Sequence, residues 1–127
     1  MYKKEKKTAE GGAGEMEGLD GAALYVANCQ SCHQQNGEGL KGAFPPLKGS
    51  KIVLDENPET MLNIIMFGYN AREEYGVMPA VSTNNKLTPE EITTIMNHER
   101  TSWGNTGRKV STDEIKKLME ALKKPAQ

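Results

Sequence analysis

The two cysteines of this chain stand three positions apart in the stretch CQSCH, residues 29–33, and a histidine directly follows the second one. Three kinds of chemistry use such a pair: a redox disulfide, a structural zinc site and covalent attachment of haem. A thioredoxin-like disulfide needs a βαβ setting, and the sequence predicts no strands. A zinc site needs two more ligands, and only His98 remains besides His33.

Covalent haem fits these residues best. Cys29 and Cys32 lie one helical turn apart, so both thiols face one side and can add to the two vinyl groups along one porphyrin edge. His33 then lies over the ring, where its imidazole can ligate the iron. We therefore predict one haem c, with its iron, bound covalently through Cys29 and Cys32. A zinc or disulfide interaction module stays open as an alternative, and a colourless protein would indicate it.

Met78 is the predicted second ligand of the iron. It lies in a loop before Pro79, which fixes the local backbone and restricts the residue that precedes it. His98 is a rival ligand, but on a helical wheel it points away from the apolar face, so we expect it on the solvent side. The other methionines considered lie in helical core patterns or in the N-terminal segment: Met61, Met66, Met96, Met119 and Met16.

The elements that position these groups are predicted to be helices. Hydrophobic periodicity and capping residues indicate four of them. The expected helices span residues 21–32, 58–68, 88–104 and about 111–123. Asp20 can cap the first helix, Thr88 and Glu91 form a capping box for the third, and Gly68 can stop the second. Ser111 and Glu114 form a second capping box. No stretch alternates with period two for long, so the predicted fold class is all-α.

Two long irregular segments, residues 36–50 and 68–86, separate these helices. Loops of this length in a small helical domain need something that orders them. Of the 127 residues 36% are hydrophobic and only 6% are aromatic, so the side-chain core is thin. A bound cofactor would supply both the order and the missing core.

The chain reads as a single domain, residues 19–127, behind a charged and Gly-rich flexible tether, residues 1–18. The net charge of −1 gives no electrostatic footprint for nucleic acid. No apolar run is long enough for a membrane span. The tether suggests a membrane or lipid anchor upstream of residue 1, or membership of a larger complex, and we expect a monomeric domain.

Taken together, CQSCH, GEG, FPPL, VMPA and TSWGN resemble the class I (monohaem) cytochromes c. The final stretch is similar to the cytochrome c domains and subunits of bacterial respiratory oxidoreductases. The resemblance covers roughly residues 19–123. It implies a small cytochrome c fold of about four to five helices around one haem, whose first and last core helices cross. It also implies a place in the periplasm or on the extracytoplasmic face of a membrane.

The resemblance implies further haem-binding residues. The carbonyl of Pro45 or Pro46 would accept the imidazole N–H of His33, which orients the ring. Gly37 and Gly39 would let the backbone approach the porphyrin. The expected pocket wall is Leu47, Ile65 and Phe67. The candidates for binding the haem propionates are Tyr69, Arg72, Tyr75 and Trp103.

Glu99 departs from the pattern of similar cytochromes. These often carry an aromatic and then an aliphatic residue before the arginine of this helix, where this chain has His98 and Glu99. On the wheel Glu99 falls on the apolar face. Either it pairs with a buried partner, or this end of the helix is more exposed than usual.

If protein ligands fill both axial positions, no coordination site is open to a substrate. The expected function is therefore outer-sphere electron transfer, with iron cycling between Fe(III) and Fe(II), between respiratory redox partners that dock through small, transient contacts. We predict no enzymatic activity, because no catalytic triad, phosphate loop or zinc-protease motif is present. If Met78 is labile, the alternative is a haem-based sensor or a peroxidase.

Overall fold

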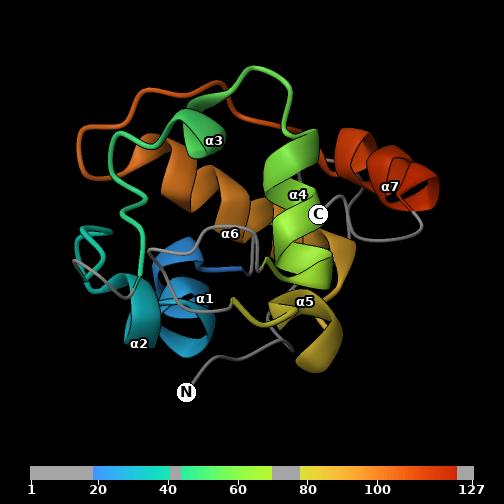
Figure 1. Cartoon of the computed structure of the whole chain (residues 1–127). Coiled ribbons are helices and arrows are strands. Elements are labelled where there is room, and N and C mark those ends of the chain that lie inside the picture. The colour runs from blue at the N-terminus through green and yellow to red at the C-terminus, as the bar shows by residue number, and fades with distance from the viewer. Residues whose placement is uncertain (1–18, 41–43, 70–77, 123–127) are drawn as a thin grey trace.

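The computed structural model describes residues 19–40, 44–69 and 78–122, and the regular elements in these ranges are helices (Figure 1). They are α1 (Gly21–Asn28), α2 (Gln30–His33), α3 (Lys51–Leu54), α4 (Glu59–Phe67), α5 (Val81–Asn84), α6 (Pro89–Thr101) and α7 (Thr112–Ala121). The all-α prediction is confirmed. The described ranges hold more helices than the predicted four to five because α2, α3 and α5 have four residues each. The predicted tether, Arg72 and Tyr75 lie outside the described residues.

Two helix boundaries differ from prediction. The expected helix over residues 21–32 is interrupted at Cys29, which has φ −129° and ψ −29° and separates α1 from α2. At the other boundary, α6 ends at Thr101 and not at Gly104, because Ser102 adopts an extended conformation. Trp103, which lies inside the helix expected over residues 88–104, has a positive φ of 58° and therefore does not continue α6.

The predicted capping residues begin their helices. The Asp20 carboxylate accepts hydrogen bonds from the amides of the second and third residues of α1, at 3.0 and 3.3 Å. Thr88 and Glu91 form both halves of a capping box, with bonds of 3.1 and 2.9 Å. Ser111 caps α7 through the Glu114 amide at 3.1 Å, but the Glu114 carboxylate binds Arg108. The second capping box is therefore only half formed.

Helix α1 packs across α6, so the expected crossing of core helices lies between the helices predicted at residues 21–32 and 88–104. Gly21 permits the close approach, because a β-carbon there would lie 2.9 Å from the Cβ of His98. The rings of Tyr25, His98 and Trp103 form an aromatic cluster beside this crossing, with centroids 5.2 to 5.6 Å apart. The prediction that His98 lies on the solvent side is wrong, because α1 covers that side of α6.

The hydrophobic core joins α3, α4, α6 and α7. Its buried members are Val53, Met61, Leu62, Ile65, Ile92, Met96, Val110 and Ile115. Arg100 of α6 is fully buried beside this core and hydrogen-bonds to other segments of the chain. Its guanidinium donates to the carbonyls of Arg108, Val53 and Asp55, at 2.6, 2.8 and 2.8 Å. These bonds tie α3 and the segment before α7 to α6.

Candidate functional site

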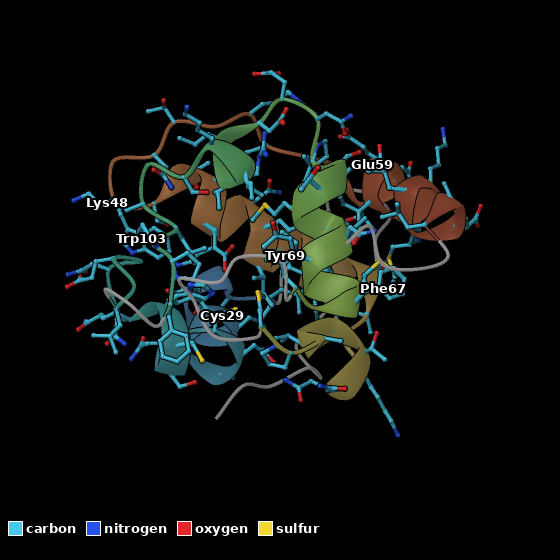
Figure 2. The ribbon with its side chains drawn as sticks, viewed as in Figure 1. Cys29, Lys48, Glu59, Phe67, Tyr69 and Trp103 are labelled. Atoms are coloured by element: carbon cyan, nitrogen blue, oxygen red, sulfur yellow. The ribbon has the colours of Figure 1, made fainter. Side chains whose placement is uncertain are left out.

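A cavity of about 330 Å³ opens beside α4 and draws its walls from every described helix except α1 and α7. Eight of the residues predicted for the site line it: Cys29, His33, Pro45, Pro46, Leu47, Ile65, Tyr69 and Met78. Figure 2 shows Cys29 and Tyr69 toward the centre of the molecule. The fold therefore brings the attachment motif, the proline loop and the predicted methionine ligand to one space.

His33 is held as a neutral imidazole with a defined orientation. It is 5% exposed, and its Nδ1 lies 2.9 Å from the carbonyl oxygen of Pro45. A carbonyl can only accept, so Nδ1 carries the proton of this bond and Nε2 keeps a lone pair. Burial lowers the pKa of His33, against a smaller opposing effect of the Pro45 bond. The neutral ring with a free Nε2 is the form that binds iron.

The two loop glycines, Gly37 and Gly39, make close contacts within the protein, and their expected approach to the porphyrin stays a prediction. A β-carbon on Gly39 would lie 2.8 Å from the Pro45 oxygen, and Gly39 has a φ of +71°. A β-carbon on Gly37 would lie 2.5 Å from the ring of Trp103. The lack of a side chain at Gly39 thus lets the Pro45 carbonyl approach His33, and the lack of one at Gly37 leaves room for the ring of Trp103.

Met78 is fixed through its backbone. It forms an isolated antiparallel bridge with Tyr69, with N···O distances of 3.0 and 2.9 Å, and both residues line the cavity. Gly68, which ends α4 as predicted, makes this bridge possible. It has a φ of +82°, and a β-carbon there would lie 2.5 Å from the Met78 carbonyl oxygen.

Asn105 joins the cavity wall to the end of α6. It is 7% exposed, and its side-chain amide nitrogen donates to the carbonyls of Leu47 and Glu99, at 3.2 and 2.8 Å. Its side-chain oxygen accepts from the amide of Gly49 at 2.8 Å. One buried amide therefore positions the loop that carries Leu47 against the helix that carries Glu99.

Glu99 lies inside the cavity wall with its carboxyl group buried. The residue is 4% exposed, and the Cys29 thiol is within hydrogen-bonding reach of the carboxylate. Burial raises the pKa of Glu99 to about 8, and the thiol contact opposes that rise. Burial, followed by the nearby Glu99, raises the pKa of the Cys29 thiol as well. Of the two situations expected for Glu99, the structure shows the buried one, with Cys29 as neighbour.

Some predicted site residues lie elsewhere. Phe67 is half-buried on the other side of α4 from Tyr69 (Figure 2) and does not line the cavity. Trp103 and His98 do not line it either, since both belong to the aromatic cluster. Cys32 is a half-buried free thiol next to His33 in sequence, and it does not line the cavity.

The sequence analysis missed several lining residues, which are Ser50, Lys51, Ile52 and Val53 around α3, Ile64 of α4, Val81 of α5 and Leu87. A local signal for α3 was present. The Ser50 hydroxyl accepts from the Val53 amide at 3.3 Å, so SKIV is an N-cap followed by an apolar pair. One helical turn is too short to show periodicity, so only the cap could have revealed it.

The donor set of this cavity fits covalent haem. It offers a thiol of the paired cysteines, a neutral imidazole with a free Nε2 and a thioether, among walls rich in aliphatic side chains. Within residues 19–40, 44–69 and 78–122, no group of three His, Cys, Asp or Glu side chains could hold a metal ion. The zinc alternative therefore finds no ligand set in that part of the chain. No helix there is long and apolar enough to cross a membrane.

Known proteins resemble this chain along most of its length. The family described as "Cytochrome C oxidase, cbb3-type, subunit III" matches residues 17–98. Cytochrome c-552 of Thermus thermophilus is 37% identical over 120 residues, which cover 85% of this chain and 90% of that protein. The cytochrome c subunit of alcohol dehydrogenase (quinone) from Gluconobacter oxydans (strain 621H) is 33% identical over 108 residues.

That alignment covers 80% of this chain but only 22% of the alcohol dehydrogenase subunit. The fructose dehydrogenase cytochrome subunit of Gluconobacter japonicus is 36% identical over 105 residues, with 78% of this chain and 22% of that subunit covered. The chain thus spans about a fifth of the length of these dehydrogenase subunits. With its haem-attachment motif and helical fold, the chain belongs to the cytochrome c family, whose members carry covalent haem c and transfer electrons.

Proposed function

We propose that this cytochrome c passes single electrons between respiratory redox partners, with His33 and Met78 as the two axial ligands of its iron. Cys29 and Cys32 would hold the haem c through thioether bonds. The observation that carries the proposal is that His33, Met78 and Cys29 line one cavity. Helix α2 supplies the imidazole, and the strand-like bridge after α4 supplies the thioether.

The residues around the cavity would set the redox potential of the iron for outer-sphere electron transfer. When bound, haem c supplies the reversible Fe(III)/Fe(II) couple. The Pro45 carbonyl holds the His33 ring and increases its basicity as a ligand, while a Met78 thioether favours the ferrous state. Leu47, Ile65 and other apolar side chains exclude water from the cavity, which also favours the less charged ferrous form.

We infer that the electron donor is a dehydrogenase or a comparable respiratory complex. Three kinds of relative support this: cytochrome subunits of alcohol dehydrogenase (quinone), fructose dehydrogenase and gluconate 2-dehydrogenase. The working place would be the periplasm or the extracytoplasmic side of a membrane, where haem is attached to such motifs. The domain from residue 19 onward would act as a monomer, with residues 1–18 as a tether to an anchor or a complex.

Optical spectra of the oxidised and reduced holoprotein test the ligand set. We expect a sulfur-to-iron charge-transfer band in the oxidised form and no change when carbon monoxide is added to the reduced form. Met78→Leu should remove the sulfur band and admit carbon monoxide. Met66→Leu is the matched control, because Met66 packs against the core and does not line the cavity.

Three results would contradict the proposal. A sulfur band that survives Met78→Leu would show that another methionine is the ligand. Carbon monoxide binding to the unmodified reduced protein would show that the sixth position opens, and would move the function toward gas sensing or peroxide chemistry. Protein that has passed through working haem-attachment machinery and still lacks haem absorption would overturn the reading as a whole.

A further inference from the structure

Glu99 is an acidic side chain in a wall that is otherwise built for an apolar cofactor. It lies one helical turn after Ile95 on α6, and both residues line the cavity. At 4% exposure its carboxyl group has almost no contact with water. An ionised carboxylate in such a place is costly unless a cation or several donors compensate it.

The neighbours of this carboxylate offer little compensation. The Tyr25 hydroxyl, on α1, donates its proton to the Gln34 carbonyl at 2.6 Å. The amide nitrogen of Asn105 is used by the Leu47 carbonyl and by the backbone carbonyl of Glu99 itself. In the described part of the chain, no salt bridge reaches the Glu99 carboxylate.

Among the described residues, the side-chain donor within reach of the Glu99 carboxylate is the Cys29 thiol, and haem attachment removes it. The Cys29 thiol can donate its S–H to Glu99, but bonding of Sγ to a vinyl carbon replaces that S–H by S–C. In residues 19–40, 44–69 and 78–122, the other titratable or charged groups near the cavity are His33 on α2, Lys51 on α3, Tyr69 after α4, and His98 and Arg100 beside Glu99 on α6. Of these, Lys51 is an exposed residue and Arg100 donates to backbone carbonyls.

We propose that Glu99 is a redox-linked proton site, which takes up one proton when the haem iron is reduced and releases it on oxidation. The redox partner supplies the electron, and solvent supplies the proton. Reduction of Fe(III) to Fe(II) and formation of the O–H bond on the Glu99 carboxylate together leave the net charge of the cavity unchanged. Oxidation reverses both events.

Electrostatics gives the direction of this coupling. The additional positive charge of the ferric site stabilises a nearby carboxylate, and its loss on reduction favours the carboxylic acid. The pKa of Glu99 is therefore higher in the ferrous than in the ferric protein. Between these two values the midpoint potential must fall as pH rises, because reduction consumes a proton. Burial already brings the pKa of this side chain to about 8, within reach of working conditions.

The test is a potentiometric titration of the holoprotein from about pH 5 to about pH 10, a range that brackets the raised pKa. Full coupling changes the reduction equilibrium tenfold per pH unit, which is about 59 mV for one electron. We expect a falling segment that approaches this slope in the unmodified protein. It should be absent in Glu99→Gln, which keeps the side-chain shape, and in Glu99→Leu, which removes the polar group.

Glu91→Gln is the matched control. Glu91 is also a buried acid on α6, at 7% exposure, but it serves the capping box and does not line the cavity. Glutamine preserves that box, so this variant should keep the sloping segment. An independent readout is the infrared difference spectrum between reduced and oxidised protein. A protonated-carboxyl C=O band should appear on reduction, and Glu99→Gln should lack it.

The inference rests on the proposed electron-transfer function only in requiring a reversible one-electron couple. A flat profile in the unmodified protein would overturn the Glu99 assignment and leave electron transfer intact. A slope that persists in Glu99→Gln would also overturn it and would assign the proton to His98 or to a haem propionate. Absence of any reversible couple would overturn both proposals.

Discussion

The backbone of Gly68 lies against the carbonyl of Met78, so close that a β-carbon on the glycine would lie 2.5 Å from that oxygen. This contact lets the segment after α4 turn sharply and pair Tyr69 with Met78. The glycine that ends the helix is therefore also the residue that admits the proposed methionine ligand to the cavity.

Gly68→Ala should disturb both stability and ligation. Alanine at a φ of +82° is strained, and the clash with Met78 adds to the strain, so we expect a loss of about 3 kcal/mol in the free energy of unfolding. Displacement of Met78 should also weaken the sulfur-to-iron band. Denaturant unfolding and optical spectra measure these two effects on the same sample.

Gly49→Ala separates strain from displacement. Gly49 has a similar φ of +72°, but no atom lies within 4 Å of its would-be β-carbon. The Gly49→Ala substitution should lower the free energy of unfolding by about 1 kcal/mol and leave the sulfur-to-iron band unchanged. Equal loss of the band in both alanine variants would mean that Gly68 has no special relation to Met78.

Gly39→Ala should change the properties of His33. The new β-carbon would meet the backbone of Pro45, 2.8 Å from the oxygen that accepts from His33 Nδ1. A lengthened bond makes the imidazole a weaker electron donor to iron, so we expect a higher midpoint potential. Potentiometry at fixed pH measures the change. Gly104→Ala, also at positive φ but without a neighbour within 4 Å, should leave the potential unaltered.

Arg100→Met should loosen α3 from α6. The substitution leaves the carbonyls of Val53, Asp55 and Arg108 without their donor in or near the core, and we expect a loss of about 3 to 5 kcal/mol. Thermal and denaturant unfolding of the holoprotein measure it. The exposed Lys117→Met on α7 should change stability by less than about 0.5 kcal/mol. A loss below about 0.5 kcal/mol for Arg100→Met would show that the three hydrogen bonds contribute little net stability.

Acid should weaken the contact between Arg108 and Glu114. The hydrogen bond from Arg108 holds the pKa of the Glu114 carboxyl below its ordinary value. Because the folded-state pKa is the lower one, this contact stabilises the fold above the unfolded pKa, and the contribution disappears as pH falls through the folded pKa. Glu114→Gln should therefore be less stable than the parent near neutral pH and equal to it in strong acid.

Urea unfolding at a series of pH values measures this convergence. Glu120→Gln, an exposed acid on the same helix, should follow the parent protein at every pH. A stability difference for Glu114→Gln that stays constant into strong acid would assign it to something other than the ionised carboxylate.

Local features account for what the sequence predicted well. Asp20, Thr88 and Ser111 cap α1, α6 and α7, because a capping bond depends only on residues within one turn. The end of α4 at Gly68 followed from the same kind of local rule. The cavity then gathers Cys29, His33 and Met78, the residues that motif and loop position had singled out.

What failed depended on contacts between distant segments. His98 was assigned to solvent from a wheel with one apolar face, but α6 is covered on a second side by α1. The contact of Gly37 with the ring of Trp103, 66 positions further along the chain, was not predicted either. The four-residue helices α3 and α5 were missed for another reason. A single turn has no period to detect, and the Ser50 cap was the local sign of α3.

The crossing of α1 and α6 has a consequence for the order in which the molecule is completed. Cys29 and Glu99 are 70 positions apart, so a chain made from its N-terminus presents the attachment motif well before the helix that will cover it. Both residues nevertheless line the same cavity, so the wall that Glu99 supplies is complete only after α6 has packed. A haem attached at Cys29 would add its own surface to that packing step. We therefore expect the folding of α6 to be coupled to the cofactor.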